Sequence, residues 1–459
     1  MKSKKIEDLA VTVYLACHNY EEYVEQSIES VLAQTYKNFE LIIIDDGSTD
    51  NSRYIINQYV GHPNVRIIFQ ENKGLIATNN IAIRAANGKY VMRLDADDYL
   101  DERALLVLVN TIEESEDLAL VFPDYYYVNK SGNVTGQERR HNFQEDVTLL
   151  DQPAHGACTL IRKKYLLEVG GYSSEFDCQD GWDVWLKLIE NYKVGNVNLP
   201  LFYYRKHGNN LTSDTEKLLS TRSKIYKKHA EKMNRANLKV IAVLPVRGLS
   251  IEKNSQILEV LGGKTMIEWT IDSAIDSELV DELIVTTPDV EIINFLKSTY
   301  GNRITIVERE LTDSLENISY KPAVISALKD RNRLDYDAIL ELTADFPFRS
   351  TSYVNKAINV MRVHDVDKVL GVIPEDSVFY MHSGSGLELV GNNYDSNLLR
   401  LERDCLFRQC GGITLTKQYC YFNEENYLDM SKGHIILSKK ASIQVKNKFD
   451  MKLAELHLW

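Results

Sequence analysis

Short apolar runs alternate with longer mixed segments in both halves of the chain. Residues 11–16, 41–44 and 90–94 form such runs in the first half, and residues 240–246 and 283–287 in the second. Continuous apolar runs of this length are typical of strands covered on both faces of a parallel sheet. Amphipathic stretches between them are typical of the helices of βαβ units. The pattern therefore predicts two α/β domains in tandem.

A basic segment, residues 216–239, separates the two halves. Leu219, Tyr226 and Met233 recur at every seventh position, which predicts a helix. A basic amphipathic helix can lie on an anionic membrane surface, but we favour a connecting helix with a solvated face. The expected organisation is a first domain, a connecting helix and a second domain, over residues 1–215, 216–238 and 239–459.

Composition and charge exclude several classes of protein. The 459 residues include 53 Lys and Arg against 66 Asp and Glu, a net charge of −13 that argues against a nucleic-acid binder. The chain has no apolar run long enough to span a membrane, and its beginning lacks the apolar core of a signal peptide. Its six cysteines form no Cys-x-x-Cys pair. We expect a cytoplasmic protein.

Two acidic turns follow predicted strands of the first half. Asp45 and Asp46 follow the run 41–44, and Asp95 and Asp97 follow the run 90–94. Ligands of open α/β sheets bind beyond the carboxyl ends of strands. Alternate residues of an extended chain face one side, and two neighbouring carboxylates suit a divalent cation that also binds substrate phosphates. A helix N-cap and an acidic surface turn are the simpler alternatives.

A third acidic site lies further along the first half. Asp180 and Asp183 are three residues apart, so on a helix they share one face. One of them is a candidate general base. Trp182 and Trp185 beside them either form a wall against a sugar ring or pack in the core.

The ordered motifs of the first ~215 residues resemble the family 2 inverting glycosyltransferases of the GT-A fold. The matching stretches are residues 16–23, 30–36, 40–50, 72–75, 94–98, 169–172, 180–186 and 203–207. The resemblance implies metal-dependent transfer of a sugar from a nucleotide-diphosphate donor, by family habit a UDP-sugar. The implied acceptor is a glycan or lipid-linked glycan of a bacterial surface polysaccharide, made at the cytoplasmic face of the membrane.

The resemblance also implies roles for single residues. The implied nucleotide-binding residues are Asn19, Asp45, Asp46 and Arg205, and the implied ligands of Mn²⁺ or Mg²⁺ are Asp95, Asp97 and His207. Asp180 is the implied catalytic base, and Asp183 is its alternative because this sequence has one more residue between the two than the family pattern. Asn79 stands where the family often has Arg.

The second half resembles the cytidylyltransferases that activate acidic sugars, such as CMP-sialic acid synthetases. The matching stretches are residues 263–271, 286–292, 342–349 and 407–413, and Arg247 lies in a loop that is expected to bind nucleotide phosphates. The family's two metal-binding carboxylates fall on Gln444 and Lys446, and a protonated lysine has no lone pair for a metal. We therefore expect this domain to keep the fold and to have lost CTP-dependent activation.

Three hypotheses remain. The leading one is an inverting glycosyltransferase with a degenerate cytidylyltransferase-like domain, built as two tandem Rossmann-like nucleotide-binding domains. The second is a bifunctional protein whose second half still makes a CMP-sugar from CTP. The third is a pair of binding modules without activity, against which Asp95, Asp97 and Asp180 count. A homodimer through the second domain is a family-level expectation.

Overall fold

A computed structural model describes residues 9–138, 154–176, 178, 180–207, 215–235, 238–248, 252, 255–311, 319–330, 335–375, 377, 379–384, 386–390, 406–423 and 430–458. For six of these only the backbone is described: Asp180, Thr215, Glu216, Asp330, Ser383 and Leu389. The chain divides into two compact units within helix α7 (Thr215–Lys232), after Thr221. None of the helices in the described ranges has the length and apolar character that crossing a bilayer requires.

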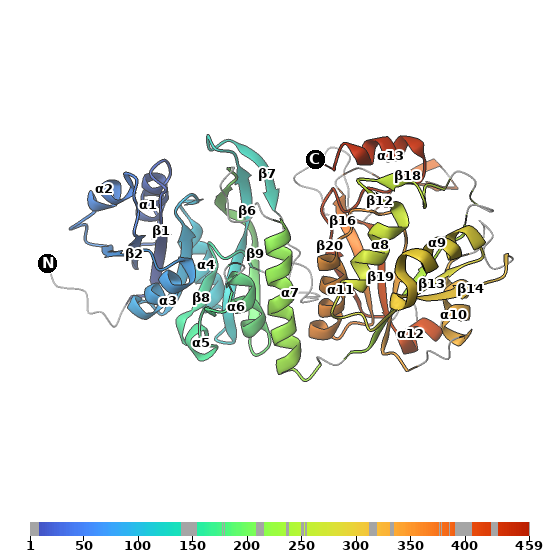
Figure 1. Ribbon diagram of the computed structural model, residues 1–459. Coiled ribbons are helices and arrows are strands. Elements are labelled where there is room, and N and C mark those ends of the chain that lie inside the picture. The colour runs from blue at the N-terminus through green and yellow to red at the C-terminus, as the bar shows by residue number, and fades with distance from the viewer. Residues whose placement is uncertain are drawn as a thin grey trace. The chain divides into compact units, whose positions relative to one another are not determined.

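The first unit contains β1 (Val11–Cys17), α1 (Val24–Leu32), β2 (Phe39–Asp46), α2 (Ser52–Asn57), β3 (Val65–Gln70), α3 (Leu75–Ala85), β4 (Tyr90–Asp95), β5 (Tyr99–Leu100), α4 (Ala104–Glu113), β6 (Leu118–Val128), β7 (Val134–Glu138), β8 (Leu160–Arg162), α5 (Lys163–Glu168), α6 (Asp180–Ile189) and β9 (Lys193–Arg205). Its sheet has the order β3-β2-β1-β4-β8-β6-β9-β5, with β7 beside β6 (Figure 1).

Both faces of this sheet are covered by helices, as the continuous apolar runs predict. On one face, Leu15 of β1 belongs to a buried cluster with Ile28 of α1 and Leu108 of α4. On the other face, Tyr14 of β1 packs in a cluster with Ala82 of α3. Adjacent residues of β1 thus serve opposite faces, because side chains alternate along a strand.

The carboxyl ends of three parallel strands meet at one edge of the first unit. The chain passes from β1 to β2 on one side, and after β3 it returns to place β4 on the other side of β1. Cys17 of β1 pairs with Asp45 of β2, and Ala16 pairs with Asp95 of β4. Ligands bind at such a reversal of strand order, so the topology brings the two acidic turns together.

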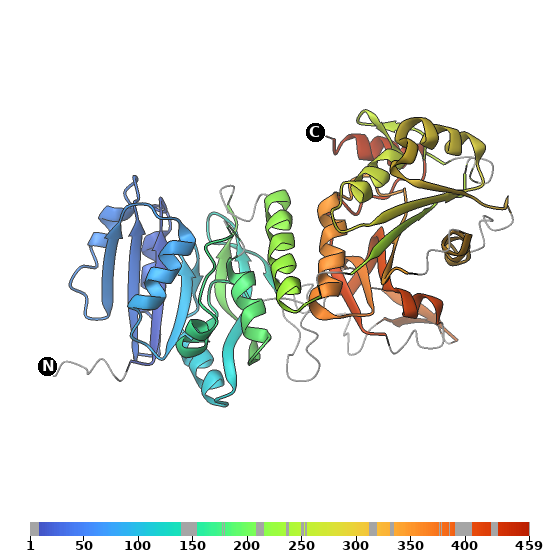
Figure 2. The same cartoon turned by 60° about the horizontal axis from the view of Figure 1, so that its bottom comes forward.

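The second unit repeats this plan. It contains β10 (Val240–Pro245), β11 (Val260–Leu261), β12 (Lys264–Thr265), α8 (Met266–Ile275), β13 (Glu282–Thr287), α9 (Val290–Tyr300), the short 3₁₀ helix Gly301–Arg303, β14 (Thr305–Glu308), α10 (Lys321–Asp330), β15 (Ala338–Leu342), α11 (Thr351–His364), β16 (Lys368–Glu375), β17 (Tyr380–Ser383), β18 (Gly386–Leu389), β19 (Leu406–Lys417), α12 (Gln418–Phe422), β20 (Lys432–Ile436) and α13 (Lys448–Glu455). The sheet order is β14-β13-β10-β15-β19-β16-β20. Figure 2 shows this unit from another side, in colours from yellow-green to red.

In this sheet the order of the strands also reverses beside β10, between β13 and β15. Ile241 and Val243 of β10 pack with Val324 and Leu328 of α10 in one buried cluster. The α/β architecture expected from the apolar pattern is therefore confirmed in both units, and all five expected strands form.

The expected connecting helix forms but is shorter than the basic segment. Helix α7 ends at Lys232 because Asn234 adopts a left-handed conformation with φ of 57°, a common way to end a helix. Leu219 and Tyr226 are buried, as the seven-residue spacing predicts.

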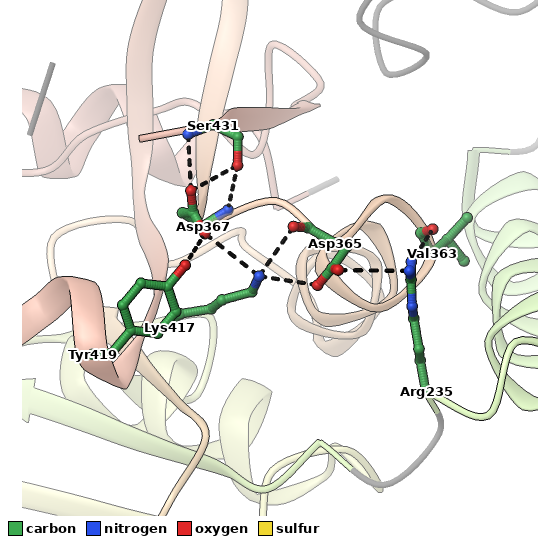
Figure 3. A network of polar contacts seen from close by, with 7 residues as sticks. All are labelled: Arg235, Val363, Asp365, Asp367, Lys417, Tyr419 and Ser431. Atoms are coloured by element: carbon green, nitrogen blue, oxygen red, sulfur yellow. Dashed lines mark hydrogen bonds and ion pairs between the residues drawn. The ribbon is translucent and has the colours of Figure 1, made fainter. Parts of the chain in front are cut away.

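A polar network holds together several strand ends of the second unit (Figure 3). The Asp367 carboxylate, just before β16, accepts hydrogen bonds from the Tyr419 hydroxyl and from the Ser431 backbone N–H (3.0 Å) and hydroxyl (2.8 Å). The Lys417 ammonium lies 3.4 Å from the same carboxylate and 2.9 Å from that of Asp365. The network joins the ends of α11 and β19 to the beginnings of β16 and β20.

Candidate functional site

Two carboxylates at the end of β2, those of Asp45 and Asp46, accept hydrogen bonds from the loops around them. The Asp46 carboxylate accepts hydrogen bonds from the Gln70 amide (2.7 Å) and from the backbone N–H groups of Lys73 (2.8 Å) and Gly74 (2.9 Å). Asp45 is fully buried and accepts a hydrogen bond from the Ser48 N–H at 3.1 Å. Both residues expected to bind the nucleotide thus shape the loops around the site.

The turn that contains Gly47 lies close against the loop that contains Asn72. Gly47 has a φ of 73°, and a Cβ atom there would lie 2.7 Å from the Asn72 backbone nitrogen, so a side chain would force the loops apart. Asn19 also has a positive φ, and its side-chain oxygen accepts a hydrogen bond from the Thr49 N–H at 2.7 Å. Exposed His18 lies beside it, with Nδ1 2.9 Å from the Asp46 carbonyl and Nε2 3.2 Å from the Asn72 amide.

His18 and Asn72 were not among the expected site residues. Both lie in stretches that carry the family resemblance, 16–23 and 72–75, so their position in these motifs is the signal that identifies them. The structure places them with Asn19 at the exposed rim of the turn after β2.

The acidic turn after β4 places like charges together. Asp95 Oδ1 lies 2.5 Å from Arg93 Nε, and Asp97 Oδ2 lies 2.8 Å from His207 Nε2. Burial and the charge of Asp95 raise the pKa of Asp97. Burial and the charges of Asp97 and Asp95 raise the pKa of Asp98, which is completely buried, well above its usual range. Of the three expected metal ligands, Asp97 and His207 are thus in contact, and Asp95 is close enough to raise the pKa of Asp97. A cation near these carboxylates would reduce their mutual repulsion.

Aromatic rings hold His207 in place. Its imidazole stacks on the Tyr23 ring with centroids 5.5 Å apart, and Tyr20 meets it edge-on at 6.2 Å. The Arg205 guanidinium lies 4.7 Å from the centroid of the same Tyr23 ring.

Arg205 has a different position from the expected one at the diphosphate. Its side chain donates hydrogen bonds to the carbonyls of Asp97 (2.9 Å) and Lys130 (3.0 Å) and to the Gln26 side chain (2.6 Å). The residue is 2% exposed. Its donors bind the protein's own oxygens, so the structure assigns it to the support of the site.

The two candidate bases differ in what the structure shows of them. Asp180 begins α6, and its side chain lies outside the described residues. Asp183 is fully buried, with Oδ2 2.5 Å from Lys187 Nζ, so its carboxylate is shielded from an acceptor. Trp185 packs in the core, 5.6 Å from the Phe122 ring, which agrees with the core alternative.

The N-terminus of α6 lies near the acidic turn. A Cβ atom on Gly181 would lie 3.2 Å from the Gly156 Cα atom, and a Cβ atom on Gly156 would lie 3.5 Å from Arg93 Nη1. Arg93 in turn contacts Asp95. The first turn of α6 therefore packs against Gly156, which lies beside Arg93.

The second unit has a cavity of about 890 Å³ at the carboxyl ends of β10 and β15, with Arg247, Gln256, Asp345, Gln444 and Lys446 among its lining residues. The Arg247 guanidinium lies 3.2 Å from Glu252 and 4.7 Å from the centroid of the Tyr320 ring. The Asp345 carboxylate accepts hydrogen bonds from the Thr343 hydroxyl and the Gln444 amide. Lys253 and Asn254, further along the loop that contains Arg247, lie outside the described residues.

Within the described ranges, no group of three or more His, Cys, Asp or Glu side chains is arranged to hold a metal ion by itself. Asp95 and Asp97 supply two carboxylates, and Mg²⁺ commonly binds to one or two carboxylates together with substrate phosphates. The donor set therefore fits a cation that binds with its substrate.

Comparisons with known proteins match a different family in each half of the chain. Residues 12–170 match the sequence model of glycosyl transferase family 2, and residues 241–448 match that of the cytidylyltransferases. The chondroitin synthase of Escherichia coli is 28% identical over 258 residues, which are 54% of this chain and 37% of that protein. The hyaluronan synthase of Pasteurella multocida is 30% identical over 203 residues, 44% of this chain and 21% of that protein. The chain thus spans well under half the length of these two relatives.

A shorter relative is matched over most of its length. The UDP-Glc:alpha-D-GlcNAc-diphosphoundecaprenol beta-1,3-glucosyltransferase WfaP of Escherichia coli is 29% identical over 226 residues, 47% of this chain and 85% of that protein. Among solved structures, residues 1–349 of Staphylococcus aureus TarS in complex with UDP-GlcNAc match with a TM-score of 0.42 and 21% identity, over 48% of this chain and 66% of that chain. The chain therefore combines a segment that matches glycosyl transferase family 2, residues 12–170, with a segment that matches the cytidylyltransferase family, residues 241–448.

Proposed function

We propose that this chain is an inverting glycosyltransferase that moves a sugar from a UDP-sugar to a glycan or lipid-linked glycan acceptor during polysaccharide synthesis. The observation that carries the proposal is the set of Asp95, Asp97 and His207 at the point where the strand order reverses. Relatives named as chondroitin and hyaluronan synthases support the polysaccharide, and a relative named for UDP-Glc supports the donor. Action in the cytoplasm at the inner face of the membrane, and a homodimer, stay predictions.

Asp95, Asp97 and His207 are the residues that would hold Mn²⁺ or Mg²⁺. When bound, such a cation neutralises the charge that builds up on the leaving diphosphate. Arg93 fixes the orientation of Asp95, while Asp97 and Tyr23 fix that of His207. The protein thereby holds its ligands in place before the donor binds.

The nucleoside would lie over the turn after β2. Asp46 holds the loop 72–74 against β2, so that His18, Asn19 and Asn72 form one rim of polar side chains. We assign these residues to the recognition of the base and ribose, with Asp45 and Asp46 as the supports beneath.

We assign the catalytic base to Asp180. An inverting transfer needs a carboxylate that takes the proton of the acceptor hydroxyl while this oxygen attacks the anomeric carbon on the face opposite the diphosphate. Asp183 is buried against Lys187, whereas Asp180 begins α6, whose N-terminal turn packs against Gly156 beside Arg93.

The test is transfer or hydrolysis of UDP-sugars by the full chain, with and without Mn²⁺. Asp97→Asn should lower the metal-dependent rate by about 100-fold, because it removes a carboxylate ligand of the cation that would neutralise the charge on the leaving diphosphate. Asp117→Asn is the matched control, since the Asp117 side chain is 70% exposed and forms an ion pair with Lys193. Equal rates in Asp97→Asn and Asp117→Asn would contradict the proposal.

We also propose that the second unit does not form CMP-sugars. The Gln444 amide and the Thr343 hydroxyl occupy the Asp345 carboxylate, and Lys446 stands where the family has a second metal-binding carboxylate. The test is release of pyrophosphate from CTP with acidic sugars and Mg²⁺. Release by the full chain would restore the bifunctional hypothesis.

A further inference from the structure

Helix α13 carries apolar side chains on both of its sides. On one side, Met451 and Ala454 are buried in a cluster with Leu261 of β11. The other side is open to solvent, where Phe449 is 69% exposed and Leu456, just after the helix, is 73% exposed. A surface helix ordinarily turns polar side chains to solvent, and a contiguous exposed apolar patch is typical of an interaction site.

The exposed apolar residues form one stripe on a well-ordered helix. Phe449, Leu453 and Leu456 are spaced four and three residues apart, so they lie on the same face. The Asn447 side chain caps the helix by accepting hydrogen bonds from the N–H groups of Phe449 (2.9 Å) and Asp450 (3.0 Å). Figure 1 shows α13 at the surface of the second unit. The stripe is therefore held in place on the outside of this unit.

Lysines accompany the stripe. Residues 439–457 contain five exposed lysines against two carboxylates, those of Asp450 and Glu455. The lysines are Lys439, Lys440, Lys446, Lys448 and Lys452. No carboxylate in the described parts of the chain is paired with any of these five ammonium groups. Lys448 and Lys452, four residues apart, border the stripe along one side of the helix, so the apolar face has a positively charged margin.

Charge decides between the possible occupants of this face. The chain as a whole has a net charge of −13, but charges further away than about 8 Å are screened at physiological salt, so the nearby lysines dominate. In a symmetric pair of copies the same patch faces itself, and lysines would meet lysines. An anionic membrane surface instead attracts the lysines and takes up apolar side chains at the boundary of its headgroups.

We propose that the exposed face of α13 docks on a membrane surface that contains anionic phospholipids. Phe449, Leu453 and Leu456 enter the headgroup boundary, and the lysines lie at the lipid phosphates. Clusters of about four to eight basic residues on an amphipathic helix are typical of such surfaces. Because the stripe is short, the binding is reversible and depends on both its apolar and its charged part.

This surface is independent of the glycosyl transfer proposed for the first unit. It belongs to the second unit, and its binding to lipid is measured without a sugar donor, an acceptor or a divalent cation. Failure of either proposal therefore leaves the other in place.

The test is flotation of the full chain with lipid vesicles. Vesicles of phosphatidylcholine with about one-third phosphatidylglycerol should bind the chain, whereas vesicles of phosphatidylcholine alone should not. Raising the NaCl concentration from about 0.1 M to about 1 M should release it, because the screening length falls from about 10 Å to about 3 Å.

A first pair of variants tests the apolar stripe. Phe449→Ser with Leu456→Ser should weaken binding to the anionic vesicles about 10-fold or more, because the apolar area that enters the lipid is lost. Both side chains are exposed, so the fold should be kept, and an unchanged melting temperature checks this. Val290→Ser with Leu311→Ser is the matched control, since both are exposed apolar residues of the same unit.

A second pair of variants tests the lysines. Lys448→Gln with Lys452→Gln should weaken the binding about 10-fold or more. Lys297→Gln with Lys329→Gln removes the same charge from other exposed positions of the unit and should leave the binding unchanged.

Three results would overturn the proposal. The chain could fail to float with the anionic vesicles, or either test variant could bind them as well as its control. The third is sedimentation, without lipid, that shows the unmodified chain as a dimer and the Phe449→Ser, Leu456→Ser variant as a monomer, because the stripe would then hold a second copy.

Discussion

The His207 imidazole is held by side chains from distant parts of the first unit. Asp97 lies 2.8 Å from its Nε2 atom, and Tyr23, just before α1, stacks on its face. Neither contact involves a neighbour in sequence. The orientation of one expected metal ligand therefore depends on an aromatic residue that would not itself touch the metal.

Replacement of Tyr23 tests this dependence. Tyr23→Leu should raise the Mn²⁺ concentration for half-maximal transfer about 10-fold or more, as is usual when the support of a metal ligand is lost. Tyr23→Phe keeps the stacking ring and should behave like the unmodified chain. The measurement is a titration of activity with Mn²⁺, with Tyr54→Leu as control because Tyr54 is 70% exposed. A loss of rate at saturating Mn²⁺ with no change in the Mn²⁺ requirement would refute this role.

Arg205 supports the site through the backbone. Arg205→Lys should lower the free energy of unfolding by about 2–4 kcal/mol, because a lysine cannot reproduce several fixed hydrogen bonds to buried oxygens. Urea unfolding measures this loss, and Arg103→Lys, at a side chain 69% exposed, should change little. If the KM for the donor rose while the stability stayed the same, Arg205 would instead contact the diphosphate.

Between elements, the network around Asp367 joins strands of the second unit that are far apart in sequence (Figure 3). Burial alone would raise the pKa of Asp367, but hydrogen bonds from Tyr419 and Ser431 and the charge of Lys417 outweigh it and lower the pKa from 3.8 to about 2. The folded state therefore favours the ionised carboxylate.

This lowered pKa predicts the pH dependence of stability. The contribution of Asp367 is fully present above about pH 5 and is lost as the pH falls through 3.8 towards 2, because the unfolded state takes up the proton first. Asp367→Asn should lower the stability by about 1–2 kcal/mol at pH 7 and by much less near pH 2. Asp335→Asn, at a side chain 71% exposed, is the control. If Asp367→Asn lowered the free energy of unfolding equally at pH 7 and pH 2, the charge of Asp367 would not contribute to stability.

For the whole molecule, the described buried clusters are separate. One set packs α1, α3 and α4 on the first sheet, and another packs α10 on the second. Each unit therefore has buried apolar clusters of its own.

Calorimetric melting of the full chain should show two transitions. UDP with Mn²⁺ at about 100 times its dissociation constant should add about 2.7 kcal/mol to the unit that binds it and raise only one transition. Asp97→Asn should remove this shift and leave the other transition in place. A single transition that shifts as a whole would show that the two units unfold together.

Much of the fold follows from local pattern. Strands β1, β2, β4, β10 and β13 form where continuous apolar runs occur, and the acidic turns lie at the carboxyl ends of β2 and β4. The order of motifs also identifies both families, because turns and strand ends recur in a fixed sequence. These features depend on how apolar and polar residues alternate and on residue type, and both can be read from a short stretch of sequence.

Partners of individual side chains follow only from the fold. Sequence alone does not show that Arg205 binds carbonyls of the residues 97 and 130, that Asp183 is buried against Lys187, or that Gln444 holds Asp345. Asp97 and His207 are 110 residues apart, yet their side chains are in contact. The sequence by itself determined the elements, the two family segments and the candidate carboxylates. The tertiary structure decided which polar groups support the site and which remain for a ligand, because hydrogen-bond partners are chosen by long-range packing and not by local pattern.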